Sequence, residues 1–397
     1  MTAPPIHHRL ISFALELSLP LLAGVVTALV WANLDPASFF GFLHWSPVEE
    51  GHTVNFHFAF NDLFMVFFFA IAAGEITESC LPGGALHPLR RAVNPLLATL
   101  GGVLGPVGFY MLYVAVTGDW EIARGWGIPT ATDIALAWLV ARVAFGPDHP
   151  AVRFLLLLAV ADDGIGLAII AIFYPDPSHP VQPLWLLLVA AGMLLAWGLK
   201  RRRVRPWWGY LVGPGTLSWT GLYLAHLHPA LALVFIVPFM PHARADVGFF
   251  ADEEEHQTDT LNRFQNAFKI PVTIGLFGFG IANAGVLFSS VGNATWAVLL
   301  GLVLGKTLGV FLFGQLAILL GFPLPVGMDR RTLFVAGLNA AMGMTVALFV
   351  AGEAFTDPVI QGAAKMGALL SAGVAVITIL AARLLRVRER PVTMGDP

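Results

Sequence analysis

Apolar residues fill this chain in long unbroken runs. Each run is close to the about 17–25 residues with which a helix crosses a bilayer, whereas the strands of an outer-membrane barrel would alternate. No small-residue cleavage site follows the first run, so we expect a retained helix and not a signal peptide. Polar positions and Pro/Gly breaks predict an all-α membrane protein with twelve transmembrane helices, over residues 10–34, 59–80, 94–117, 126–143, 151–174, 183–200, 206–221, 223–241, 264–289, 294–320, 332–352 and 358–386.

Composition and charge favour the same architecture. The 397 residues are 57% hydrophobic and 12% charged, whereas soluble domains carry about 25% charged residues. With the N-terminus inside, 18 of the 22 Lys and Arg residues fall in inside segments, as the positive-inside rule requires. The only basic residue in the outside segments is Arg124. The remaining three, Lys269, Lys306 and Lys365, fall within predicted spans. We expect one polytopic domain over 1–397 in a bacterial inner membrane, in contact with lipid, with both termini cytoplasmic.

Two polar segments lie between the predicted spans. The outside segment 44–60 contains Val54-Asn55-Phe56-His57-Phe58, whose alternation predicts a short, hairpin-like strand. The longest inside loop, 242–263, contains Asp252-Glu253-Glu254-Glu255-His256. This acidic run is either a solvated loop or a titratable cluster at the inside mouth, because histidine changes charge between about pH 5 and 8.

Four charged residues share the depth of the membrane centre. Asp162 and Asp163 lie halfway along the fifth predicted span, Asp133 halfway along the fourth, and Lys306 near the middle of the tenth. An ionisable group costs at least about 2.5 kcal/mol there, so it usually marks a site or a pathway. One interpretation is a structural ion-pair cluster. Three carboxylates against one lysine leave surplus negative charge, which favours a site for a cation or for protons.

The chemistry of these side chains indicates exchange. Carboxylates are hard oxygen ligands that suit a small hard cation. A buried carboxylate beside a second one holds either a proton or a sodium ion, and this competition is the simplest chemistry of a cation/proton exchanger. Asp62 and Glu75, toward the outer and inner ends of the second span, either line an entry funnel or lie in headgroup water.

Two predicted spans look interrupted. Residues 125–133 form a poor continuous helix because Pro129 lacks an N–H and the glycines favour unwound backbone. Paired interruptions in two halves are typical of transporters with inverted repeats. Asp133 would offset the positive ends of half-helices and Lys306 the negative ends, or else the small residues merely permit close packing. The span 332–352 carries the comparable residues Gly337, Asn339, Gly343 and Thr345.

Six segments resemble the NhaA family of sodium/proton antiporters, in the family's order and over nearly the whole chain. The Thr-Asp, Asp-Asp and Gly-Lys segments together are highly specific. The six are Asn61-Asp62 with Gly74-Glu75, residues 127–135 (GIPTATDIA), Ala161-Asp162-Asp163-Gly164, Ala282-Asn283-Ala284-Gly285-Val286, Gly305-Lys306-Thr307-Leu308-Gly309 and Gly343-Met344-Thr345.

The resemblance implies roles for the mid-membrane residues. Asp163 resembles the principal ion and proton carrier, and Asp162 resembles its partner, paired with Lys306. Thr132 and Asp133 resemble the unwound part of the fourth helix, which crosses the broken eleventh. Sodium or lithium would leave as protons enter, and two protons per sodium would make the exchange electrogenic.

The resemblance implies further roles nearer the surfaces. Asp62 and Glu75 match acidic positions of the second helix, and His228 resembles a histidine linked to pH response. Segment 44–60 resembles a dimerising hairpin, so we expect a homodimer. The chain departs from the family at the inside mouth, where Ile76-Thr77-Glu78 replaces a basic pair and the ninth helix lacks a glutamate and histidines. An unusual pH response is therefore expected.

Other functions fit the sequence less well. A transporter of organic anions on the same scaffold would want arginines at mid-depth, and none occurs there. An intramembrane aspartyl protease needs aspartates on two helices, whereas Asp162 and Asp163 are adjacent, and a transport-dead sensor would not keep Asp163. No zinc spacing, Walker motif or nucleotide-binding glycine loop occurs, so we expect no cofactor, no enzymatic activity and no nucleic-acid partner.

Overall fold

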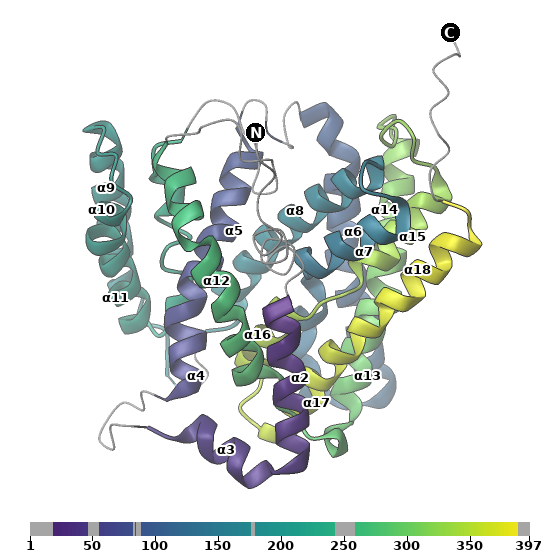
Figure 1. The fold of residues 1–397 in the computed structure, drawn as a ribbon, viewed down its shortest axis with the longest axis horizontal. Coiled ribbons are helices and arrows are strands. Elements are labelled where there is room, and N and C mark those ends of the chain that lie inside the picture. Colours follow the sequence, from purple (N-terminus) through teal and green to yellow (C-terminus); the bar gives the residue numbers. More distant parts are fainter. Residues whose placement is uncertain are drawn as a thin grey trace, which may run out of the picture.

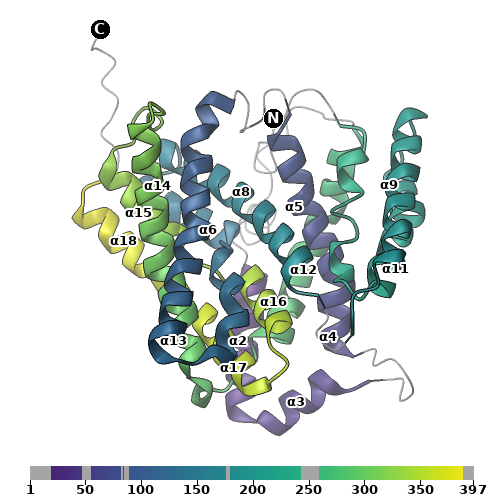
Figure 2. The same cartoon turned by 180° about the vertical axis from the view of Figure 1, so that it is seen from behind.

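The computed structural model describes residues 19–46, 55–81, 84, 89–175, 179–242 and 259–387. Helices running side by side make up most of this part of the chain, which contains no strand (Figures 1 and 2). The middle of segment 44–60 and the acidic loop with His256 lie outside the described residues, so what the sequence predicts for them stays a prediction.

Seven helices in the described ranges are long and apolar enough to cross a membrane. Helices suit this setting because they satisfy their own backbone hydrogen bonds. Their bounds follow the predicted spans closely. They are α4 with η1 and α5 (Phe56–Phe58, Ala59–Phe64, Met65–Ser79), α6 (Leu89–Thr117), α8 (Pro150–Phe173), η3 with α9 (Pro183–Trp185, Leu186–Arg201), α12 (Thr260–Ala284), α13 with η8 and α14 (Asn293–Leu300, Gly301–Lys306, Thr307–Leu319), and α17 with η9 and α18 (Pro358–Leu370, Ser371–Gly373, Val374–Leu384).

Two further spans are bent at a short break. η2 (Trp120–Thr130) and α7 (Ile134–Phe145) meet at 58°, and α15 (Arg330–Ala340) and α16 (Thr345–Ala354) meet at 49°. Counting each bent pair as one span gives up to nine spans over the described residues, and α2 (Leu19–Leu34) is a shorter apolar helix. The structure thus shows a multi-helix membrane architecture, but the predicted count of twelve is not reached in this part of the chain.

The continuous helix predicted over residues 223–241 is wrong. After α11 (Thr216–Leu224) the chain makes short turns, among them η5 (Pro229–Leu231) and η6 (Val237–Phe239). Pro229 and Pro238 lack the N–H that a continuing helix would use. The segment is apolar and largely buried, which explains why its hydropathy resembles that of a span. The preceding short span contains α10 (Trp208–Tyr210), η4 (Leu211–Gly215) and α11.

The strand predicted around residues 54–58 is also wrong where the structure describes it. Residues 56–58 begin a helix, and the Asn55 side chain accepts a hydrogen bond from Phe58 N at 2.8 Å. Asn55 is therefore a helix N-cap, which outweighs the alternating pattern. On the other side of the undescribed residues, α3 (Pro36–His44) lies across the lower end of the molecule in both views (Figures 1 and 2).

Close packing of α6 against α14 places the tenth predicted span. A Cβ atom on Gly105 would lie 2.1 Å from the carbonyl oxygen of Gly305, and one on Gly101 would lie 2.1 Å from that of Gly309. Glycine on both helices is what permits this approach. Because Gly305 and Lys306 are adjacent, the contact also fixes where the lysine enters the protein interior.

We predict that Gly105→Ala destabilises the protein, because its methyl group overlaps backbone that cannot turn away. Overpacking of this kind costs about 1–3 kcal/mol. Thermal unfolding of the purified protein in detergent measures the effect. Gly108→Ala on the same helix is the matched control, because nothing lies within 4 Å of its Cβ position. Equal melting temperatures for the two variants would contradict a tight α6–α14 contact.

Candidate functional site

The breaks of the two bent spans meet each other inside the protein. The backbone N–H of Asp133 donates to the carbonyl oxygen of Met342 at 2.8 Å. A Cβ on Gly343 would lie 2.7 Å from the carbonyl oxygen of Ala131, so glycine is needed where the chains cross. Segments more than 200 residues apart therefore share one unwound centre, and α16 lies near the middle of the molecule (Figure 2).

Side chains at the crossing satisfy the helix ends that the breaks expose. The Asp133 carboxylate accepts from Leu136 N at 3.0 Å and so caps α7, and it also lies close to Thr345, the first residue of α16. The Thr132 hydroxyl donates to the carbonyl oxygen of Ala340, the last residue of α15, at 3.1 Å. A carboxylate thus faces two positive helix ends, and a hydroxyl satisfies a negative one.

Lys306 and Asp162 form a fully buried ion pair beside this crossing. The Lys306 Nζ lies 2.6 Å from Asp162 Oδ2, and both side chains are 0% exposed. The same oxygen accepts a hydrogen bond from the Thr132 hydroxyl at 2.7 Å. Lys306 also donates to the carbonyl oxygen of Thr130, the last residue of η2. One ammonium group therefore neutralises a carboxylate and caps the negative end of a half-helix.

Asp163 lies next to this pair but has a different environment. Its side chain is buried, with 7% of the residue exposed, and its Oδ1 has no hydrogen-bond partner in the described part of the chain. Asp162, Glu75 and Asp133 all act on it electrostatically as negative charges. Asp163 therefore remains available to a cation or a proton. It faces a narrow crevice lined by Phe69, Ala72, Leu167 and Val346.

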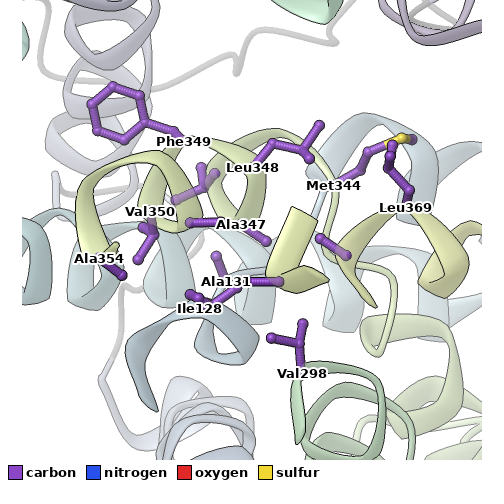
Figure 3. Close-up of a cluster of buried hydrophobic side chains, with 14 of the residues drawn as sticks. Ile128, Ala131, Val298, Met344, Ala347, Leu348, Phe349, Val350, Ala354 and Leu369 are labelled. Carbon is purple, nitrogen blue, oxygen red and sulfur yellow. The ribbon is translucent and has the colours of Figure 1, made fainter. Parts of the chain in front are cut away.

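Apolar side chains enclose the crossing on its other sides. Figure 3 shows Ile128 and Ala131 of the first broken span packed near Met344 and Ala347 of the second, with Val298 of α13 beneath them. Such a shell keeps water away from the charged residues, and electrostatic interactions are stronger where water is absent.

The structure places the remaining predicted site residues in different surroundings. Glu75 is half-buried and acts on Asp163, so it lies toward the site. Asp62 is half-buried, and its backbone oxygen accepts from the Trp219 indole at 3.4 Å. His228 contacts Glu353, with 3.1 Å between Nε2 and Oε1. His256 is outside the described residues.

Sequence reasoning missed two features of the interior. Glu353 contacts His228, and Lys365 acts on Glu353 electrostatically, although the sequence analysis gave neither residue a role. Glu353 falls just beyond the predicted span 332–352. Asn61 and Asn283 form a reciprocal amide pair, with N···O distances of 3.3 and 2.7 Å, that joins η1 to α12. Both asparagines lie in sequence segments that resemble the antiporter family, and this resemblance was the signal that could have pointed to the pair.

Comparison with known proteins identifies the architecture. A family model described as Na+/H+ antiporter 1 matches residues 10–384. The protein named Na(+)/H(+) antiporter NhaA from Geobacter sulfurreducens is 60% identical over 376 residues, covering 95% of this chain and 98% of that protein. The protein of the same name from Desulfitobacterium hafniense is 59% identical over 96% of this chain and 97% of its own length. The protein of the same name from Jannaschia sp. is 44% identical, covering 97% of this chain and 100% of its own length.

We predict that Thr132→Val weakens the site while Thr132→Ser preserves it. Valine has the shape of threonine but lacks the one hydroxyl hydrogen that the Ala340 carbonyl and Asp162 Oδ2 share. An unsatisfied buried group costs about 1–3 kcal/mol. Thermal unfolding measures this loss, and a Val variant as stable as the Ser variant would show that the hydroxyl does not bridge these two acceptors.

Proposed function

We propose, from the premise that this chain belongs to the Na⁺/H⁺ antiporter 1 family, that it exchanges sodium for protons at Asp163 and Asp162. Members of this family are secondary transporters and not enzymes, so the chain is a multi-pass membrane transporter. The observation that carries the site assignment is the contrast between the two adjacent carboxylates. Asp162 Oδ2 is paired with Lys306 and accepts from Thr132, whereas in the described structure Asp163 forms no ion pair and its Oδ1 has no hydrogen-bond partner.

In this proposal Asp163 binds either sodium or a proton. A sodium ion would lie against the Asp163 carboxylate, where three neighbouring carboxylates add negative potential. A proton on Asp163 would remove the charge that attracts the ion. Because the two ligands compete for one group, the site releases sodium on the side where protons are abundant.

Lys306 gives the proposed exchange its second proton. Sodium at Asp163 would draw on Asp162 as a second ligand and so compete with the Lys306 ammonium for that carboxylate. Lys306 would then release a proton, and two protons would enter for each sodium that leaves. This stoichiometry moves net charge, so we propose that the exchange is electrogenic and accepts lithium as well as sodium.

The broken spans support alternating access around this fixed site. The hydrogen bonds from Thr132 to Ala340 and from the Asp133 backbone N–H to Met342 join both spans at one point. A change of charge at the site therefore acts directly on the half-helices. We propose that the two spans are the crossing, broken fourth and eleventh helices of an inverted repeat, with Asp133 supporting the helix ends and not binding the ion.

The placement of the whole chain belongs to the same proposal. We place it in a bacterial inner membrane, surrounded by lipid, with both termini in the cytoplasm, as a homodimer joined through segment 44–60. Asp62 and Glu75 would line the outer and inner approaches to the site. His228 at one end, and His256 with its acidic neighbours at the other, would adjust activity to pH.

Rival functions are supported less well. A proteolytic site needs two carboxylates that share one water, whereas Asp162 is already bound by an ammonium and a hydroxyl. An organic-anion site would need a free cationic group in the crevice, whose described lining residues are Asp163 and four apolar side chains.

We predict that Asp163→Asn abolishes exchange without unfolding the protein, because an amide carries neither the proton nor the full negative charge. Sodium-induced dequenching of a pH-sensitive dye in everted vesicles measures the exchange. Asp148→Asn is the matched control, since Asp148 is exposed just before the same helix. Sodium-dependent proton flux in the purified Asp163→Asn variant at near the wild-type rate would refute the assignment.

We predict that Lys306→Gln is destabilised and, where still active, exchanges closer to one proton per sodium. Breaking a well-buried pair costs about 3–5 kcal/mol. Lys306→Arg separates the two roles, because arginine keeps the ion pair but does not deprotonate. The Lys306→Arg variant should therefore be more stable than Lys306→Gln, and it should still exchange closer to one proton per sodium.

Transport in proteoliposomes under an imposed membrane potential measures this stoichiometry. An electrogenic exchanger responds to the potential and an electroneutral one does not. If an active variant of Lys306 keeps the full voltage response of the wild type, the lysine is a structural counter-charge and the aspartates carry both protons.

A further inference from the structure

A second charged cluster lies at the opposite end of α16 from the Asp133 contact. Glu353 is in the last turn of α16, and its Oε1 lies 3.1 Å from Nε2 of His228, with the side chains 22% and 7% exposed. The His228 ring also packs edge-on against Phe349, with ring centroids 4.6 Å apart. At about 1.5 Å per residue, Glu353 lies about 12 Å along the helix from Thr345.

Groups from several other elements face this glutamate. Lys365 of α17 is buried, and it interacts electrostatically with Glu353, as does His57 of α4. Asp62 of η1 acts on both His228 and Glu353. We call these five residues, His57, Asp62, His228, Glu353 and Lys365, the Glu353 cluster. It joins α16 to α17, to the start of the second span and to the turn that precedes η5.

The position of Glu353 is unfavourable for the helix that carries it. The C-terminal end of a helix has a partial negative charge, so a carboxylate in the last turn is normally destabilising. The exposed carbonyl oxygens of this end, those of Gly352 and Phe355, accept from the Gln361 side chain at 3.0 and 2.9 Å. Two carbonyl groups at this end are thus satisfied without Glu353, whose carboxylate is stabilised there by cations from other elements. A residue that breaks a local rule in this way is commonly functional.

We propose that Glu353 is a positioning residue for exchange. Through His228 and Lys365 it holds the C-terminal end of α16, and it thereby sets the balance between the conformations in which the site opens to one face or the other. The inference rests on the proposed function, since it takes α16 as the moving half-helix whose other end lies at Asp133.

Sodium dependence on the two faces tests this role. Glu353→Gln removes the charge while keeping the shape of the side chain. A shift in the conformational balance makes sodium bind more tightly on one face and more weakly on the other. We expect the ratio of the half-saturation concentrations, measured in right-side-out and everted vesicles, to change by about fivefold or more, the lower end of typical coupling between sites. A structural defect alone would weaken both faces together.

Controls make each outcome decisive. Glu121→Gln, at an exposed glutamate of η2, should leave the ratio unchanged. If Glu353→Gln does not fold, the double variant Glu353→Gln/Lys365→Met removes both charges and should change the ratio in the same way. An unchanged ratio in a folded variant, with or without a lower melting temperature, overturns the proposal. Failure of the proposed function would be visible separately, as wild-type vesicles without sodium-dependent proton flux.

Discussion

A helix that breaks inside a membrane must find partners for the backbone groups that the break exposes. Each unsatisfied group costs several kcal/mol in hydrocarbon, and here two breaks lie side by side. The structure meets this constraint with three side chains. Lys306 donates to the carbonyl end of η2, Thr132 donates to the carbonyl end of α15, and Asp133 caps α7. The glycine contacts between α6 and α14 and the apolar shell around the crossing both serve to hold these three groups in place.

The same side chains also form the charged site, and in the proposed function this overlap couples ion binding to the broken spans. Lys306 and Thr132 both donate to Asp162 Oδ2, so neither can change its contact with the carboxylate without affecting a helix end. A ligand shifts a conformational equilibrium only as far as it binds one state better than the other. Here the proposed ion site and the half-helix ends share atoms, so that difference in binding needs no long chain of intermediate contacts.

Much of this arrangement could be predicted from the sequence, and the reasons for the failures are physical. The depth of Asp133, Asp162, Asp163 and Lys306 follows from counting residues along apolar runs, and the family resemblance is confirmed over nearly the whole chain. The contacts of Thr132 with Ala340 and of Asp133 with Met342 could not be predicted, because they join segments whose proximity depends on the whole fold. The helix predicted over residues 223–241 is wrong because hydropathy reports burial and not whether the backbone forms helical hydrogen bonds. The strand predicted from the alternation at residues 54–58 is wrong because the Asn55 side chain caps a helix that begins at the next residue.

Glu353 shows a further limit of sequence reasoning and leads to the last step of the argument. A carboxylate near the end of a span resembles an ordinary interfacial residue, and only its neighbours reveal that it lies among His228, Lys365 and Asp62. α16 is therefore held at both ends by charge: at its start by Asp133 in the unwound centre, and at its end by the Glu353 cluster. A short rigid helix fixed in this way has few ways to move. If it changes position when the occupant of Asp163 changes, the contacts at one of its two ends must change, and the far end is the one whose charged group, Glu353, belongs to α16 itself.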